Sequence, residues 1–385
     1  MHIVSIASNS YLPRARVLGH SIKKHCPKAF FSLILVDREP EGFTHSREPF
    51  DEVIQFQELG LSIKNFSQWL FFHDLFELSC ALKAKAVLTI IERHKADKVI
   101  WLDSDIALFS SLDDIETLLE TYSIIVTPQI TEPETDTQAI IDNEINSLGY
   151  GLFNLGFLAV RSDETTYQFL LWWNERLMQF CHRDREKGLF VDQKWMNLAP
   201  VFFNNVYLLK GKGYNVSIWN ISQRILKKEG NGAYSINGAP LRFVHFSSVY
   251  SPGLKERVEQ YAKGISVFYE LLTWYTQQLK EYGQGKYGAL QWTYDFYSNG
   301  EAIKYSHRLI YYKRNDLQNM FPDPFDSSDG NSFSAWCESN PYQAEIDNPY
   351  YHELQSLLNS KSWRITAPFR VVNNFFKRVL TLFTR

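Results

Sequence analysis

The sequence predicts an α/β fold with a mostly parallel central sheet, helices on both of its faces, and a helical accessory region toward the C-terminus. Two observations support this class. Short apolar runs of strand-forming residues alternate with segments of helical periodicity through residues 1–105, and such alternation is typical of parallel sheets. Polar residues follow each run directly. They therefore lie at the carboxyl edge of the sheet, where ligands bind in folds of this class.

The first part of the chain contains predicted strands and helices in alternation. The strands are at residues 2–7 (HIVSIA), 30–36 (FFSLILV) and 99–102 (VIWL), and the helices are at 14–25 and 75–94. In the second helix, apolar residues recur at the three- and four-residue spacing of a buried helical face. Asn9, Asp37 and the pair Asp103 and Asp105 follow the successive strands, which is the first indication of a shared site.

The rest of the chain is less regular. Further strands are predicted at 153–160, 206–209 and 241–246 and a further helix at 167–181, while 264–314 is helical and rich in aromatic residues. We therefore expect a catalytic α/β domain at 1–258, a helical accessory region at 259–314, a linker rich in Pro, Asp and Ser at 315–358, and a basic amphipathic tail at 359–385.

Composition excludes several classes of protein. The 385 residues carry 40 basic and 43 acidic side chains, for a net charge of -3, and 45% of them are hydrophobic. Disordered, collagen-like and nucleic-acid-coating chains do not combine such an apolar fraction with near-neutral charge. Aromatic residues reach 15%. Their flat faces suit stacking on sugars or nucleobases, although most aromatic side chains belong to cores.

Several features predict a cytoplasmic protein. The four cysteines lie far apart, without a CxxC pair, which favours unpaired thiols in a reducing compartment. The N-terminal segment lacks the basic and long apolar regions of a signal peptide, so we expect it to be the first strand. No apolar run approaches the roughly 18 residues that a membrane span needs.

The C-terminal tail differs from the rest of the chain in charge. Residues 359–385 contain six basic side chains and no acid. From Phe369 onward, apolar and polar residues occupy opposite faces of a helix, a pattern typical of helices that lie in an anionic bilayer interface. A helix docked on the domain explains the same pattern, so both interpretations remain open. The first predicts a peripheral protein of the inner face of the plasma membrane.

Asp103-Ser104-Asp105 is the strongest local indication of chemistry. In an extended segment, residues i and i+2 point the same way, so the two carboxylates converge and repel. A hard divalent cation relieves this repulsion, because carboxylate oxygens are its preferred ligands. Such a cation can hold a diphosphate and neutralise it as a leaving group. A surface turn explains most D-x-D sequences, but here the motif directly follows an apolar strand of an α/β pattern.

Four ordered segments carry a resemblance to a known family. The first comprises residues 77–88 and 99–115 (ELSCALKAKAVL, VIWLDSDIALFSSLDDI). The other three are 153–161 (FNLGFLAVR), 191–197 (VDQKWMN) and 244–248 (VHFSS). Together they resemble nucleotide-sugar glycosyltransferases of the GT-A fold, most of all the retaining, family-8-like bacterial branch. The resemblance covers about residues 1–258 and implies a GT-A-like sheet and a hexosyltransferase activity.

The resemblance also implies roles for individual residues. Asp103, Asp105 and His245 would ligate Mn²⁺ or Mg²⁺, with imidazole favouring Mn²⁺ slightly. Without the motif, His245 reads equally well as a core histidine. The implied donor-binding residues are Asn9 and Asp37 near the base and ribose, Lys83 near the phosphates or sugar, Asp103, Ser104 and Asp105 at the metal, and Asn154 near the transferred sugar.

Asp192 and Gln193 are the candidates for catalysis. In the retaining branch, a side chain near the anomeric carbon acts as a weak nucleophile or stabilises an oxocarbenium-like ion pair. Asp192 could instead only orient a sugar hydroxyl. The sequence departs from the family pattern at Lys194, which replaces an acid, and at Lys255, which lies later than the lysine that binds the donor diphosphate. These departures indicate a changed donor or acceptor contact.

The hypothesis is a metal-dependent transferase that moves a hexose-type sugar from a nucleotide diphosphate sugar to a glycan or lipid-linked acceptor. SKSWRITAPFR (residues 360–370) resembles segments near the ends of enzymes that build bacterial surface polysaccharides. Nothing indicates a nucleic-acid partner. A sugar-nucleotide pyrophosphorylase needs a Gly-rich loop after the first strand, and SNSYLPRAR has no glycine. The remaining alternative is a glycan-binding or scaffold protein with a decayed transferase site.

Overall fold

The computed structural model describes residues 1–247, 249–251 and 253–341. The chain divides into two compact units. Among the described residues, the first contains 1–63 and 75–295, and the second contains 64–74 and 296–341. All the candidate site residues belong to the first unit.

A sheet forms the centre of the first unit and confirms the predicted α/β class. In the described residues it has seven strands in the order β3-β2-β1-β4-β7-β6-β8. Their bounds are β1 His2–Ala7, β2 Phe30–Leu35, β3 Glu52–Gln55, β4 Lys98–Leu102, β6 Ile124–Pro128, β7 Phe153–Arg161 and β8 Val206–Leu208. β7 is antiparallel to β4 and β6, and the other neighbours are parallel. Because β2, β1 and β4 are adjacent, the polar residues that follow them share one edge.

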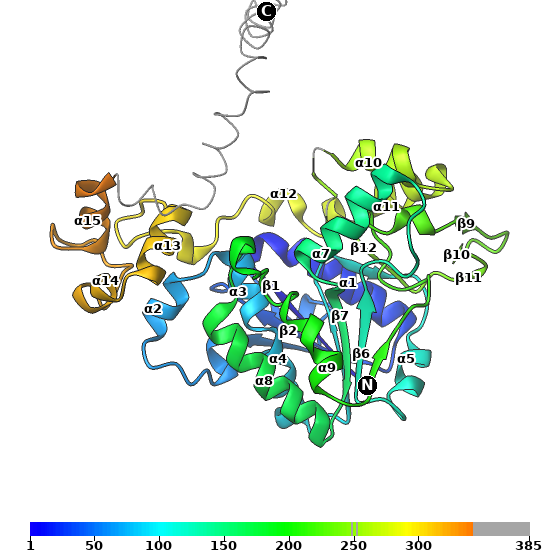
Figure 1. The fold of residues 1–385 in the computed structure, drawn as a ribbon, viewed down its shortest axis with the longest axis horizontal. Helices are drawn as coiled ribbons and strands as arrows, with labels where there is room; N and C mark the ends of the chain where they lie inside the picture. Colours follow the sequence, from blue (N-terminus) through cyan, green and yellow to red (C-terminus); the bar gives the residue numbers. More distant parts are fainter. Residues whose placement is uncertain (248, 252, 342–385) are drawn as a thin grey trace, which may run out of the picture. The chain divides into compact units, whose positions relative to one another are not determined.

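Helices cover the sheet (Figure 1). Those of the first unit are α1 Leu12–His25, α3 Leu75–Ala81, α4 Lys83–His94, α5 Asp113–Leu118, α6 Thr137–Ala139, α7 Asn146–Tyr150, α8 Glu164–Phe180, α9 Ala199–Phe202, α10 Leu254–Tyr261, α11 Ile265–Glu281 and α12 Gln284–Tyr287. Leu12, Ala15, Leu18 and Ile22 of α1 recur at helical spacing and share a buried core with β2. On α4, Val87 and Ile91 are buried, and this helix contacts β1 and β4 and packs against α8.

The helix predicted over residues 75–94 is in fact two helices. α3 ends at Ala81 and α4 begins at Lys83, with Leu82 between them at φ -82° and ψ -11°. Apolar periodicity continues across this break because residues on both sides of it are buried. The break makes Lys83 the first residue of a helix, and its side chain is buried.

Two strands outside the main sheet position the candidate site. β5 (Ile106–Leu108) pairs antiparallel with β12 (Phe243–His245), in a register that sets His245 opposite Ile106. The strand predicted at 241–246 is therefore β12, and its partner β5 was not predicted. Nearby, β9 (Leu226–Lys228), β10 (Tyr234–Ile236) and β11 (Ala239–Pro240) form a small antiparallel sheet.

The second unit is helical. Its described helices are α2 Phe66–Phe71, α13 Tyr305–Lys313, α14 Asn315–Met320 and α15 Phe333–Ser339. Phe71, Tyr311 and Phe333 lie in one buried core, and the buried guanidinium of Arg308 donates to the carbonyls of Phe71 (3.2 Å) and His73 (2.8 Å).

The structure revises the interpretation of two segments. The part of the predicted linker that is described contains α14 and α15, because Phe321, Phe333 and Cys337 are buried despite their polar neighbours. The predicted helical stretch at 264–314 is interrupted between α12 and α13. The basic amphipathic tail lies outside the described residues. In the described part of the chain, no helix has the length and hydrophobicity needed to cross a membrane, and the four cysteines are buried and form no disulfide.

Candidate active site

The acid pair lies in the turn that joins β4 to β5. The backbone N–H of Asp103 donates to the carbonyl of Gly156 on β7 (2.9 Å), and the N–H of Ile106 donates back to the carbonyl of Asp103 (3.0 Å). Ser104 is buried between the two acids. The indole Nε1 of Trp101 donates to Asp103 Oδ1 at 2.8 Å. These bonds hold the turn rigidly at the carboxyl end of β4.

His245 completes the cluster from β12. Its Nε2 lies 3.0 Å from Asp105 Oδ1 and 3.9 Å from Asp103 Oδ2, and one ligand atom from each residue lies within 4.8 Å of the others. Asp105 and His245 are buried, while Asp103 is partly exposed. Two carboxylates and an imidazole so close together fit a divalent cation of the Mn²⁺ or Mg²⁺ class.

The protonation of this cluster is set by its own charges. Burial disfavours the charged form of His245, but the carboxylates of Asp105 and Asp103 outweigh it and raise the pKa of the imidazole. Burial likewise opposes the charge on Asp105, but His245 outweighs it and lowers the pKa of that carboxyl. In the absence of a cation, a proton on Nε2 therefore balances the acids. A divalent cation at the same position would replace that proton.

Two amides orient the imidazole. Its Nδ1 lies 3.2 Å from Asn154 Oδ1 and 3.2 Å from Asn215 Oδ1. The backbone N–H of Gly156 also donates to Asn154 Oδ1, at 3.0 Å, so this atom is an oxygen and accepts. Nδ1 must then carry a proton. In the absence of a cation Nε2 carries a second proton, which faces the carboxylate of Asp105, and a bound cation would take the Nε2 lone pair instead. In metal-binding histidines, a hydrogen bond of this kind from the nitrogen that does not bind the metal fixes the tautomer.

Gly156 makes room for the imidazole. A Cβ added at this position would lie 2.4 Å from Cε1 and 2.5 Å from Nδ1 of His245. Both distances are far below van der Waals contact. Residue 156 of the segment FNLGFLAVR must therefore be glycine, because the imidazole of His245 on β12 occupies the space that a side chain would need.

Lys83 connects the Asp-Asp-His cluster to Asp192. Its Nζ lies 3.1 Å from Asp103 Oδ1 and 2.9 Å from Asp192 Oδ2, and donates to the carbonyl of Leu155 at 2.9 Å. Burial opposes the charge on the ammonium, but Asp103 and Asp192 outweigh it and raise the pKa of Lys83. Lys83 is therefore a cation that balances two acids inside the protein.

Asp192 and its neighbour Gln193 are held differently. Asp192 is buried, which raises its pKa although Lys83 acts in the opposite direction. The preceding Val191 has φ 39°, a strained backbone for a β-branched residue, and such strain is frequent at functional sites. Gln193 is half-buried and donates from Nε2 to the carbonyl of Tyr150 at 3.0 Å. This bond ties Gln193 to the C-terminal end of α7.

Asn9 and Asp37 meet at the neighbouring part of the sheet edge. The N–H of Asn9 donates to Asp37 Oδ2 (3.4 Å), and Asn9 Nδ2 donates to the carbonyl of Arg38 (2.9 Å). The hydroxyl and N–H of Thr293 both donate to Asp37 Oδ1. Burial raises the pKa of Asp37, against these hydrogen bonds. The buried Oδ1 of Asn9 has no hydrogen-bond partner among the described atoms.

The structure adds residues that sequence reasoning missed. Asn215 stands in an Asn-Val-Ser sequence that matches a glycosylation acceptor, yet its side chain is buried against His245. Its φ of 47° lies in the left-handed region that asparagine tolerates better than most residues. No local pattern identifies it. Lys255 is exposed on α10, 3.7 Å from Glu259.

The sheet and the Asp-Asp-His cluster at its carboxyl edge agree with the GT-A class of glycosyltransferases. Residues 2–252, which include every candidate site residue, match the model of the family described as "Glycosyl transferase family 8". The chain belongs to this family and is a glycosyltransferase.

Two proteins of Bacillus subtilis (strain 168), both described as uncharacterized, are similar to this chain. YfnD is 23% identical over 250 residues, which are 64% of this chain and 77% of YfnD. YfnF is 26% identical over 159 residues, which are 39% of this chain and 49% of YfnF. The chain thus spans about half the length of the second relative.

Solved glycosyltransferase structures are also similar. The galactosyltransferase LgtC, in complex with donor and acceptor sugar analogs, is 14% identical with a TM-score of 0.42, over 71% of this chain and 95% of LgtC. The glycosyltransferase GlyE of Streptococcus pneumoniae TIGR4 is 15% identical with a TM-score of 0.41, over 77% of this chain and 66% of GlyE.

Proposed function

We propose that this glycosyltransferase uses Mn²⁺ or Mg²⁺ to transfer a hexose-type sugar from a nucleotide diphosphate sugar to a glycan or lipid-linked acceptor, in the synthesis of a surface polysaccharide. The observation that carries the proposal is the cluster of Asp103, Asp105 and His245, whose ligand atoms lie within 4.8 Å of one another. When bound, the cation supplies Lewis-acid stabilisation of the departing diphosphate.

The chain's own residues bind and orient the donor in this proposal. Asn9 and Asp37 contact the base and ribose, and the partnerless buried Oδ1 of Asn9 supports a ligand hydrogen bond there, because buried polar atoms are nearly always paired. Ser104 contacts the diphosphate of the donor in this proposal. Lys83 acts mainly by holding Asp103 and Asp192 in place, since both carboxylates lie within 3.1 Å of its ammonium.

Asn154, Asp192 and Gln193 surround the transferred sugar. The ion pair with Lys83 (2.9 Å) keeps Asp192 in one position and reduces its nucleophilicity, which favours an orienting hydrogen bond to a sugar hydroxyl. Gln193 is then the candidate for the side chain beside the anomeric carbon. Retention of configuration is proposed from the family-8 branch that the motifs resemble, and NMR of the anomeric proton of the first product tests it.

The acceptor and the location are also proposals. A glycan or lipid-linked acceptor at the cytoplasmic face of the plasma membrane fits the basic sequence of residues 359–385. Co-sedimentation of the full chain with anionic vesicles, compared with neutral ones, tests the membrane contact. Retention of the chain by anionic vesicles supports it, and equal recovery in both supernatants contradicts it.

Donor binding is the first test of the proposed function. Thermal unfolding is measured with a panel of nucleoside diphosphates, each with and without Mn²⁺, because a ligand of the native state raises the melting temperature. We expect one nucleotide to stabilise the protein only when Mn²⁺ is present. The double variant Asp103→Asn, Asp105→Asn should lose this response, and Asp113→Asn, an exposed acid on α5, should keep it. Glycan binding without any nucleotide response would favour the decayed-site alternative.

A further inference from the structure

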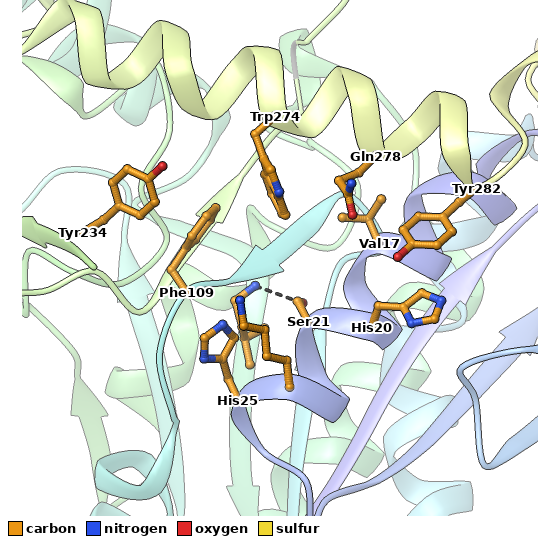
Figure 2. A pocket seen from close by; sticks show the side chains of 11 residues that line it. Val17, His20, Ser21, His25, Phe109, Tyr234, Trp274, Gln278 and Tyr282 are labelled. Atoms are coloured by element: carbon orange, nitrogen blue, oxygen red, sulfur yellow. Dashed lines mark hydrogen bonds between the residues drawn. The ribbon is translucent and has the colours of Figure 1, made fainter. Parts of the chain in front are cut away.

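A cavity lies in the first unit, lined by residues other than those of the candidate active site (Figure 2). Its volume is about 270 Å³, and it lies between α1, α11 and the strands β5 and β10. Ligand pockets commonly measure about 300–1,000 Å³. The cavity is therefore of a size for one sugar ring with a substituent and too small for a nucleotide sugar.

One wall of the cavity is aromatic. Trp274 lies on α11, Tyr282 directly follows that helix, Phe109 follows β5, and Tyr234 lies on β10 (Figure 2). Phe109 packs edge-on against Trp274 (5.2 Å between ring centres) and Tyr234 (5.6 Å). All four rings are half-buried, so they are held by their neighbours and still present surface to a ligand. Such rings offer apolar faces with polar edges.

A basic part of the lining comes from α1 and adjoins the aromatic part, since the ring of His20 stacks on that of Tyr282 (4.5 Å between ring centres). His20 and Lys24 are four residues apart and share one face of the helix, and His25 and Ser21 line the cavity beside them. Within the described part of the chain, the lining contains no acid, and Lys24 forms no ion pair with a carboxylate. Burial lowers the pKa of both histidines, which leaves Lys24 as the charge of this part of the lining.

Two acids close in sequence to lining residues are already engaged. Glu281 accepts a hydrogen bond from Gln278 at 2.8 Å, and Glu270 accepts one from the hydroxyl of Tyr234 at 2.7 Å and pairs with Lys228. The ammonium of Lys24 therefore lacks a balancing anion from the protein. An aromatic wall that adjoins an unbalanced cation is complementary to a ring that carries a negative group.

We infer that this cavity binds an acidic sugar residue of a glycan chain. The sugar ring lies against Trp274, its carboxylate or phosphate contacts Lys24, and its hydroxyls hydrogen-bond to the neutral imidazole of His25 and the amide of Gln278. Among anionic ligands we choose a glycan because the chain is a glycosyltransferase. The choice of ligand therefore rests on the proposed function. A site of this kind holds a glycan on the enzyme independently of the donor.

The test measures glycan binding to the full chain in the absence of nucleotide and Mn²⁺. The probes are an array of oligosaccharides that carry uronate or phosphate groups, together with the same oligosaccharides after carboxyl reduction or dephosphorylation. Trp274→Ala and Lys24→Gln are compared with two matched controls. Trp172→Ala removes another half-buried tryptophan, on α8, and Lys28→Gln removes an exposed lysine that follows α1.

We expect acidic oligosaccharides to bind and their neutral forms to bind about tenfold more weakly, because loss of an ionic contact worth about 1.4 kcal/mol lowers affinity by that factor. Trp274→Ala and Lys24→Gln should each weaken binding, and the controls should not. Lys24 is exposed, so Lys24→Gln remains informative if Trp274→Ala does not fold. Binding of no acidic oligosaccharide, or equal binding by Lys24→Gln and wild type, overturns the inference. A normal nucleotide response with Mn²⁺ in the same preparation shows that the proposed function stands even then.

Discussion

Removal of the Asn215 side chain should weaken both the fold and the proposed metal site, in patterns that differ between two variants. In the described structure, this buried amide donates to Thr127 Oγ1 (2.8 Å) and Asn154 Oδ1 (2.9 Å) and accepts from His245 Nδ1 (3.2 Å). At roughly 1 kcal/mol for each hydrogen bond, Asn215→Gly should lower the free energy of unfolding by about 3 kcal/mol. Asn215→Ala should cost about 1 kcal/mol more, because alanine is unfavourable in the left-handed region that φ 47° occupies.

Metal affinity should respond in a different pattern. Both variants remove the oxygen that orients the imidazole, and loss of such a contact typically weakens metal binding about 10–100-fold. The assay is a Mn²⁺ titration followed by the EPR signal of the free aqueous ion, which needs no nucleotide. Asn205→Gly and Asn205→Ala are matched controls, since Asn205 has φ 57° and is exposed on the loop before β8. These controls should differ in stability by a similar amount and bind Mn²⁺ normally.

The two measurements together can refute the reasoning. Wild-type Mn²⁺ affinity in Asn215→Gly would show that the amide does not orient His245. An affinity loss that follows the stability loss, with the alanine variant clearly weaker than the glycine variant, would show that backbone distortion and not the missing oxygen is responsible.

Three further predictions concern other contacts of the first unit. Lys83→Met should lower the free energy of unfolding in a urea titration by about 3–5 kcal/mol, because it leaves a buried carboxylate unpaired. Adding Asp192→Asn should restore part of this stability. Simply additive losses would contradict the ion pair between Lys83 and Asp192 (2.9 Å). Gly156→Ala should weaken Mn²⁺ binding by about tenfold or more, since its methyl group displaces the ligating imidazole, whereas Gly230→Ala, with nothing within 4 Å, should bind normally. Burial lowers the pKa of His2 to about 4; because the unfolded chain then binds more protons, stability should be complete above about pH 6.5 and fall toward pH 4. His2→Gln should flatten this dependence in a series of thermal melts, and an unchanged slope would rule out His2 as its source.

Much of the fold follows from local sequence patterns. The strands HIVSIA and FFSLILV appear in the structure as β1 (His2–Ala7) and β2 (Phe30–Leu35), because each is a short run of strand-forming residues that ends at polar residues. Burial on both faces accounts for their near-continuous hydrophobicity. Asp103 and Asp105 could be paired for the same local reason, since two residues separated by one position in an extended turn point to the same side.

Contacts between distant segments could not be read in this way. The pairing of β5 with β12 brings His245 to Asp105. The segment VHFSS predicted this contact only through its resemblance to a family. Asn215 reaches His245 from a loop whose sequence matches a glycosylation acceptor. Lys83 reads as a residue of a helical surface, and only the packing of α4 against β1 and β4 gives it Asp103, Asp192 and the carbonyl of Leu155 as partners.

The sequence by itself thus determined the α/β class, most strands of the central sheet and the local pair of carboxylates. Tertiary structure decided which side chains balance and orient that pair, where the helix over 75–94 divides at Leu82, and that Phe321 and Phe333 bury a core within a segment rich in Pro, Asp and Ser. The physical reason is the range of the interactions. Hydrophobic periodicity reports which face of one element is buried, whereas a charge or an amide is satisfied by whatever the fold places within about 3 Å of it.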